Sequence, residues 1–148
     1  MFKFIKDKNF TIILTTNLSS DVYKKIVMSA PPSTFHVINC SLHLSDKNFK
    51  LDIFKSRVYL LKSLGYSLCI NLVGHPDQIM LADECARWTK NIGISFSLIP
   101  LIGDINGISF RSIEDYPEPL KRVIKKYSHI TLVDKNRFNN GERIDKLI

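Results

Sequence analysis

The stretch Ile38-Asn39-Cys40-Ser41-Leu42-His43-Leu44-Ser45 decides the fold, because polar and apolar residues alternate along it. Residues two apart on a β-strand point to the same face of a sheet. One face of this strand therefore holds Asn39, Ser41 and His43, and the other holds apolar side chains and Cys40. We expect the apolar face to pack under helices and the polar face to line an interior shared with other strands.

The same alternation recurs at three other places in the chain, around Asn17, Asn71 and Ile99. Taking Asn17, His43, Asn71 and Ile99 as equivalent strand ends, successive ends lie about 26 to 28 residues apart. That length accommodates one strand and one helix. The sequence therefore predicts a repeated β/α unit.

Helical patterns fill the intervals between these strands. Two of them place apolar residues three and four apart and end at Gly65 and Gly93, in the position that favours glycine after a helix. A first, shorter helix runs from Asp21 toward Ala30 and stops before Pro31. The two apolar stripes consist of Phe54, Val58, Leu61 and Leu64, and of Leu81, Cys85, Trp88 and Ile92.

Parallel strands joined by helices form right-handed βαβ units, so the sequence from Phe10 to Gly103 predicts four consecutive β/α steps. An open doubly wound sheet has helices on both faces and favours strands that are apolar throughout. A barrel has its helices outside and can keep a polar interior around a ligand. We therefore expect a partial (β/α) barrel with its binding site at the C-terminal ends of the strands.

Four segments in order resemble the third to sixth strands of a radical S-adenosylmethionine enzyme, over most of residues 10–112. They are Thr15-Thr16-Asn17-Leu18-Ser19, Ser41-Leu42-His43, Asn71-Leu72-Val73 with Pro76, and Pro100-Leu101-Ile102-Gly103 followed by Asn106-Gly107. The resemblance implies a six-stranded partial barrel in which S-adenosylmethionine is cleaved reductively to a radical. It divides the chain into a partial barrel at 1–112 and a C-terminal helix with a short tail at 113–148.

The family's CxxxCxxC motif, which binds a four-iron four-sulfur cluster, has no counterpart here. The three cysteines, Cys40, Cys69 and Cys85, are scattered and are expected to point in different directions, so neither a shared metal nor a disulfide is expected. We interpret the chain as a fragment, inactive alone, whose first two barrel strands precede Met1 and whose tail is truncated. Neither S-adenosylmethionine nor the cluster is expected to bind it tightly. Unpaired thiols suit a cytoplasmic location.

By resemblance, Asn17, Ser41, His43 and Asn71 lie on the cofactor side of the site, and His75 and Asn106 on the substrate side. No catalytic or metal-binding residue is predicted. These polar side chains could instead satisfy one another in a half-buried interior. The loops at 74–77 and 103–107 could cradle a phosphate or serve only as turns.

The composition, 148 residues with a net charge of +7, is typical of one globular domain. The densest basic cluster, Lys121, Arg122, Lys125 and Lys126, is interpreted as the solvated face of a helix over 119–127, and nucleic-acid binding is not expected. No apolar run is long enough for a membrane span or a signal peptide.

Two further classes of function stay open: a half-barrel module for a nucleotide or phosphorylated ligand, and a self-assembling α/β protein without catalytic activity. Expected partners are a complementary N-terminal fragment or a second copy, paired through the edge of the strand at 11–17. In the tail, residues 129–133 are predicted as a short strand and residues 139–141 as a turn.

Overall fold

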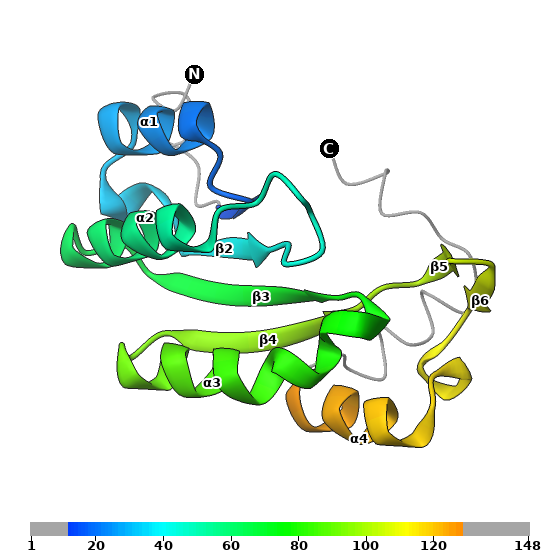
Figure 1. The fold of residues 1–148 in the computed structure, drawn as a ribbon. Helices are drawn as coiled ribbons and strands as arrows, with labels where there is room; N and C mark the ends of the chain where they lie inside the picture. The colour runs from blue at the N-terminus through cyan, green and yellow to red at the C-terminus, as the bar shows by residue number, and fades with distance from the viewer. Residues whose placement is uncertain (1–11, 129–148) are drawn as a thin grey trace.

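A computed structural model of the chain describes residues 12–128. The predictions for the strand at 129–133 and the turn at 139–141 lie outside these residues. The first seven main elements alternate strand and helix and are followed by a hairpin and a last helix (Figure 1). They are β1 (Ile13–Thr16), α1 (Ser20–Ser29), β2 (Val37–Leu42), α2 (Leu51–Ser63), β3 (Leu68–Gly74), α3 (Ala82–Asn91), β4 (Ser95–Pro100), β5 (Gly103–Ile105), β6 (Ile108–Phe110) and α4 (Glu118–Tyr127).

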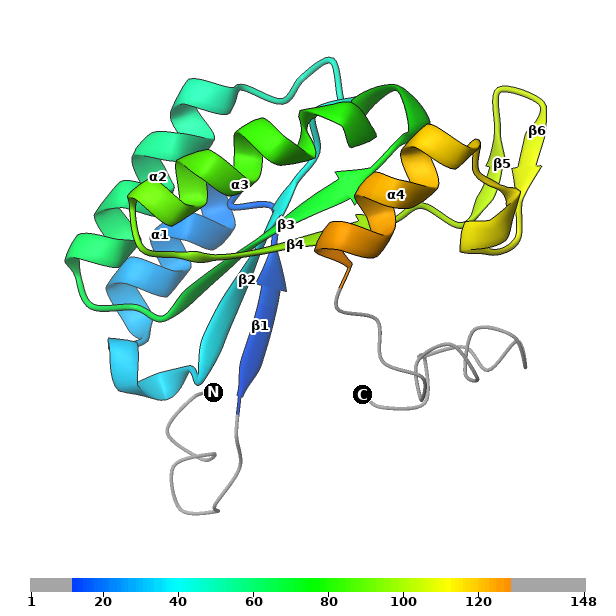
Figure 2. The ribbon, with the colours of Figure 1, turned by 90° about the horizontal axis from the view of Figure 1, so that it is seen from below.

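The four long strands form one parallel sheet in the order β1-β2-β3-β4, which confirms the predicted run of consecutive β/α units. Helices α1, α2 and α3 lie on the same face of this sheet (Figure 2). Helix α4 joins them beside α3, where its Tyr127 ring packs edge-on against Phe96 of β4 at 5.4 Å between centroids. Within residues 12–128 no helix covers the opposite face.

The core lies between the sheet and the helices. The helix-facing side chains of β2, β3 and β4 are fully buried at Ile38, Cys40, Ile70, Leu72 and Leu98. Their strand neighbours on the other face are mostly half-buried or exposed. The alternation predicted from the sequence is therefore confirmed, and it places a polar surface on the side away from the helices.

The predicted helix ends at glycine are also confirmed. Gly65 (φ +89°) and Gly93 (φ +63°) follow α2 and α3 in the left-handed conformation that glycine adopts without steric cost. Each predicted apolar stripe includes one terminal residue that is not buried in its helix. Leu64 lies past the last turn of α2 and is 45% exposed, and Leu81 belongs to the short 3-10 helix η3 (Pro76–Leu81) and is 39% exposed.

The strand ends predicted to be equivalent were shifted by two residues at two strands. Asn71 pairs in register with Ser41 on β2 and Ser97 on β4, so His43 and Ile99 lie further along the chain than the level of Asn71. A constant interval fails because the connections differ: the first contains the 3-10 helix η2 (Pro32–Thr34) and the second a long loop before α2. Sequence spacing alone does not fix register.

The basic residues of α4 are paired with acidic ones. Lys121 Nζ lies 3.3 Å from Glu118 and 3.5 Å from Glu114, and its side chain is only 18% exposed. The other three ion pairs are Arg122–Glu118, Lys125–Glu114 and Lys126–Asp83. Arg122, Lys125 and Lys126 are exposed, as predicted for a solvated face, whereas Lys121 is shielded; all four charges have acidic partners. The absence of nucleic-acid binding stays a prediction.

In residues 12–128, no helix has the length and apolar character needed to cross a membrane.

Candidate ligand site on the polar face of the sheet

The helix-free face of the sheet presents a row of amide and hydroxyl side chains. Ser41, Asn71 and Ser97 are direct register partners across β2, β3 and β4. Asn17 continues the row on the β1 side, since it follows the paired residues Thr16 and Cys40 by one position. Adjacent strands lie about 4.8 Å apart, so one small polar molecule can contact several members of the row. We call Asn17, Ser41, Asn71 and Ser97 the polar row.

A second polar level lies one pleat earlier on the same face. Its members are register partners from all four strands: Thr15, Asn39, Cys69 and Ser95. Burial is deepest in the middle of the face, where Cys69 and Asn39 are half-buried and Ser95 at the edge is exposed. The polar row and this level together offer hydrogen-bond donors and acceptors without a charged residue.

Asn71 is the best-shielded member of the polar row, with 7% of its surface exposed. The Cys69 thiol donates a weak hydrogen bond to Asn71 Oδ1 at 3.5 Å. Within residues 12–128, the Asn71 side chain has no other hydrogen-bond partner. Its amide nitrogen is not fully enclosed, since Ser128 Oγ is the one buried side-chain nitrogen or oxygen without a partner among residues 12–128, so this donor is open to solvent or to a polar ligand.

Asn17 is held by the turn between β1 and α1. Asn17 Oδ1 accepts a hydrogen bond from the Ser19 amide at 3.1 Å, and Thr16 Oγ1 accepts one from the Leu18 amide at 3.0 Å. Leu18 itself has φ +54°, an unusual conformation for a residue with a side chain. Arg57 Nη1 of α2 donates to the Leu18 carbonyl at 2.6 Å. The turn is therefore fixed from both sides, and within residues 12–128 the Asn17 amide nitrogen has no hydrogen-bond partner.

The two predicted histidines lie beyond the polar row and have separate local roles. His43 follows β2, is half-buried, and its carbonyl accepts a hydrogen bond from the Asp46 amide at 3.1 Å. His75 caps the start of η3: its Nδ1 accepts from the Asp77 amide at 3.4 Å. The structure does not bring either imidazole into register with Asn17, Ser41 or Asn71.

Asn106, predicted to contact substrate, lies in the turn of the β5–β6 hairpin. Asn106 (φ +52°) and Gly107 (φ +79°) are the two residues that connect these strands. Asn-Gly is the preferred pair for this tight turn, so the turn accounts for both residues. The other loop considered for phosphate begins at Gly74, where an added Cβ would meet the Ile99 carbonyl and the Leu98 side chain at 3.1 Å.

The three thiols lie in three different environments. Burial, and to a smaller extent the neighbouring Cys69, raises the pKa of Cys40 to about 12, and burial raises that of Cys69 on the opposite face of the sheet. Burial also raises the pKa of Cys85 on α3 to about 11. Among residues 12–128, no three His, Cys, Asp or Glu side chains are grouped to hold a metal ion. These residues therefore do not fit the cluster that the resemblance implies.

Ser97 was not among the predicted site residues, although it belongs to the polar row. Ser97 follows the same polar–apolar alternation as the other members, but placing Ile99 level with Asn71 puts Ser97 two residues before the predicted strand end. Comparisons of the chain with models of known protein families, with curated proteins and with solved structures found no match.

Proposed function

We propose that the sheet is a section of a partial (β/α) barrel and that its polar row binds the nucleoside part of S-adenosylmethionine. The strand order β1-β2-β3-β4 with α1 to α3 on one face supports the barrel, because a doubly wound sheet has helices on both faces. The polar face supports the ligand site, since it would line the barrel interior. The row lies near the C-terminal end of β2 but in the middle of β3 and β4, so a ligand there would sit deeper than the strand ends where barrels usually bind their ligands.

The proposed ligand rests mainly on one observation, the row Ser41–Asn71–Ser97 with the shielded amide of Asn71 at its centre. A hydroxyl and an amide can both donate and accept hydrogen bonds, as ribose hydroxyls require. In this proposal Ser41 and Asn71 contact the ribose, Asn17 donates through its free amide nitrogen, and Ser97 extends the contact toward β4.

The chain would contribute the nucleoside and substrate side of a radical enzyme's site and would be inactive alone. The cluster and its cysteine motif would come from residues outside this sequence, in one chain with it or on a complementary fragment. Without the chelation that a cluster provides, binding of S-adenosylmethionine would be weak. We expect a dissociation constant near or above 1 mM, about −4 kcal/mol.

Calorimetry with S-adenosylmethionine and S-adenosylhomocysteine tests the proposal. Ser41→Ala and Asn71→Ala should each weaken binding by about tenfold, the loss expected for one good hydrogen bond to a ligand. Ser56→Ala and Asn91→Ala, which change exposed residues of α2 and α3, serve as matched controls and should bind as the unsubstituted chain does.

Two results would contradict this assignment. Tight binding that survives both Ser41→Ala and Asn71→Ala would mean that the nucleoside lies elsewhere. Binding of adenosine monophosphate well above that of either nucleoside would favour the alternative of a module for phosphorylated ligands.

A further inference from the structure

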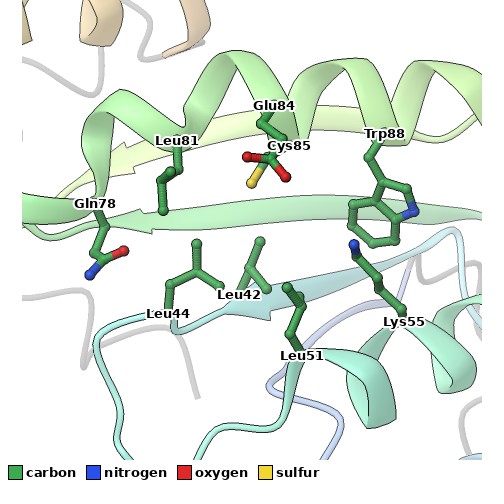
Figure 3. Close-up of a pocket in the computed structure, with 9 residues that line it drawn as sticks. All are labelled: Leu42, Leu44, Leu51, Lys55, Gln78, Leu81, Glu84, Cys85 and Trp88. Carbon is green, nitrogen blue, oxygen red and sulfur yellow. The ribbon is translucent and has the colours of Figure 1, made fainter.

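A separate pocket lies on the helical side of the sheet, between α2 and α3 at the end of β2 (Figure 3). It encloses about 230 Å³. Its walls are mainly apolar and come from three segments that are distant in the sequence: Leu42, Leu44, Leu51, Leu81, Cys85 and Trp88. Because the sheet separates it from the polar row, it is a second candidate site, independent of the proposed function.

Three polar side chains line the pocket, and two of them have opposite charges. Lys55 from α2 and Glu84 from α3 reach toward it, together with Gln78 (Figure 3). Lys55 Nζ lies 5.2 Å from the centroid of the Trp88 ring, whose Nε1 donates to Tyr59 at 2.9 Å. Neither Lys55 nor Glu84 forms an ion pair within the part of the chain that the structure describes.

The charges of Lys55 and Glu84 both influence the Cys85 thiol, which lines the pocket. Burial is the main reason why the pKa of the Cys85 thiol is raised, but Glu84 raises it further and Lys55 lowers it. The ammonium and the carboxylate are thus both within electrostatic reach of one point on the wall, yet are not paired with each other. A ligand that places a negative group near Lys55 and a positive group near Glu84 would satisfy both.

We propose that this pocket binds an apolar α-amino acid, with its carboxylate facing Lys55, its ammonium facing Glu84 and its side chain against the leucines. Pockets for drug-sized ligands typically enclose about 300–1,000 Å³. This pocket is smaller, so its volume suits a smaller ligand such as a single amino acid. A fatty acid would place its apolar chain or its carboxylate against Glu84. An aliphatic amine would place its apolar chain or its ammonium group against Lys55. Lys55 is half-buried and Glu84 is exposed, and a zwitterion is the class of small ligand that complements both charges at once.

The single tryptophan of the chain, Trp88, makes binding directly observable. Titration with L-leucine should change its fluorescence saturably in the millimolar range, and calorimetry should give the same affinity. Lys55→Met and Glu84→Gln should each weaken binding by about tenfold, as expected when a charge-assisted contact is lost. The matched controls Lys25→Met and Asp21→Asn change exposed charges on α1 and should leave the affinity unchanged.

Two analogues test the chemical class. 4-Methylpentanoate lacks the ammonium group and isopentylamine lacks the carboxylate, so each should bind about tenfold more weakly than leucine. The proposal is overturned if a correctly folded chain, checked by circular dichroism, gives neither heat nor a fluorescence change with leucine at about 20 mM, a concentration well above the millimolar affinities of weak ligands. Equal affinity for leucine and either analogue, or unchanged affinity in both charge variants, would also overturn it.

Discussion

Replacing Arg57 by Met should destabilise the fold and loosen the turn that presents Asn17. The Arg57 guanidinium donates to the carbonyl of Leu18 at 2.6 Å and lies 5.5 Å from the Tyr23 ring. Leu18 is 1% exposed, so the substitution leaves its carbonyl poorly solvated. Met retains most of the apolar stem, which restricts the loss to the polar contacts.

The magnitude follows from these contacts. A hydrogen bond from a charged donor contributes about 1.5–3 kcal/mol, and the contact with Tyr23 adds about 0.5–1 kcal/mol. We expect Arg57→Met to lower the free energy of unfolding by about 2–4 kcal/mol, a large share of the roughly 5–15 kcal/mol of a typical domain. Arg57→Lys should recover part of this, because it keeps a charged donor but not the planar group.

Urea unfolding monitored by circular dichroism provides the assay. Lys62→Met is a matched control, since Lys62 also donates from α2 to a backbone carbonyl, that of Gly93 at 3.1 Å, but at an exposed position. The control should lose less than about 0.5 kcal/mol. Equal losses for Arg57→Met and Lys62→Met would refute the argument that burial of the Leu18 carbonyl gives Arg57 its importance.

Three further predictions concern the end of β3, the two buried thiols and the edge of β1. Gly74→Ala should cost about 1–3 kcal/mol of stability, because its Cβ would press on the rigid Ile99 carbonyl at 3.1 Å; urea unfolding measures this. Cys40 and Cys85 should resist alkylation by iodoacetamide at pH 7.5, because their raised pKa keeps the thiols protonated, and mass spectrometry should show full labelling only in urea. Light scattering should show association that increases with concentration, because Ile13 on the edge strand β1 is 57% exposed.

Each of these three predictions can be contradicted by a specific result. An unchanged unfolding midpoint for Gly74→Ala would mean that the ends of β3 and β4 move apart easily. Rapid labelling of Cys40 in the native protein would show that it is not part of the core. A monomer that unfolds cooperatively at high concentration would mean that the edge of β1 is protected.

The buried thiols also make the free energy of unfolding depend on pH. A thiol whose folded pKa is raised contributes stability below its unfolded pKa, near 9, and that contribution is lost as pH rises toward the folded value. The relevant folded values are about 11 for Cys85 and about 12 for Cys40. The free energy of unfolding should therefore decrease progressively above pH 9, and less so in Cys85→Ala after its own loss at neutral pH is subtracted.

Alternation along single strands was sufficient to predict the layers of this fold. It assigned Cys40 to the buried face and Asn71 to the polar face because the side-chain period of a strand does not depend on tertiary contacts. The glycines after α2 and α3 were similarly predictable from local backbone conformation. Parallel strand order followed from the intervals that can hold a helix.

Register and side-chain contacts between distant elements could not be predicted in the same way. The interval rule placed His43 level with Asn71, whereas the sheet pairs Ser41 with it, because connections of unequal length shift each strand independently. The contact between Arg57 and Leu18 joins residues 39 positions apart. The pocket at Trp88 exists only when α2 and α3 pack together; the stripe of Leu81, Cys85 and Trp88 was visible in the sequence, but its approach to Leu42, Leu51 and Lys55 was not.

Nuclear magnetic resonance of the side-chain amides tests the central claim most directly. Asn71 lies in the polar row, and Gln78 lies on the opposite side of the sheet in the apolar pocket, so one spectrum contains both a site probe and an internal control. Titration with S-adenosylhomocysteine should shift the Asn71 amide resonances progressively while those of Gln78 stay unchanged. Shifts at Gln78 without shifts at Asn71, or no shift at either at about 10 mM ligand, ten times the lower bound of the expected dissociation constant, would contradict the assignment of the polar row as a nucleoside site.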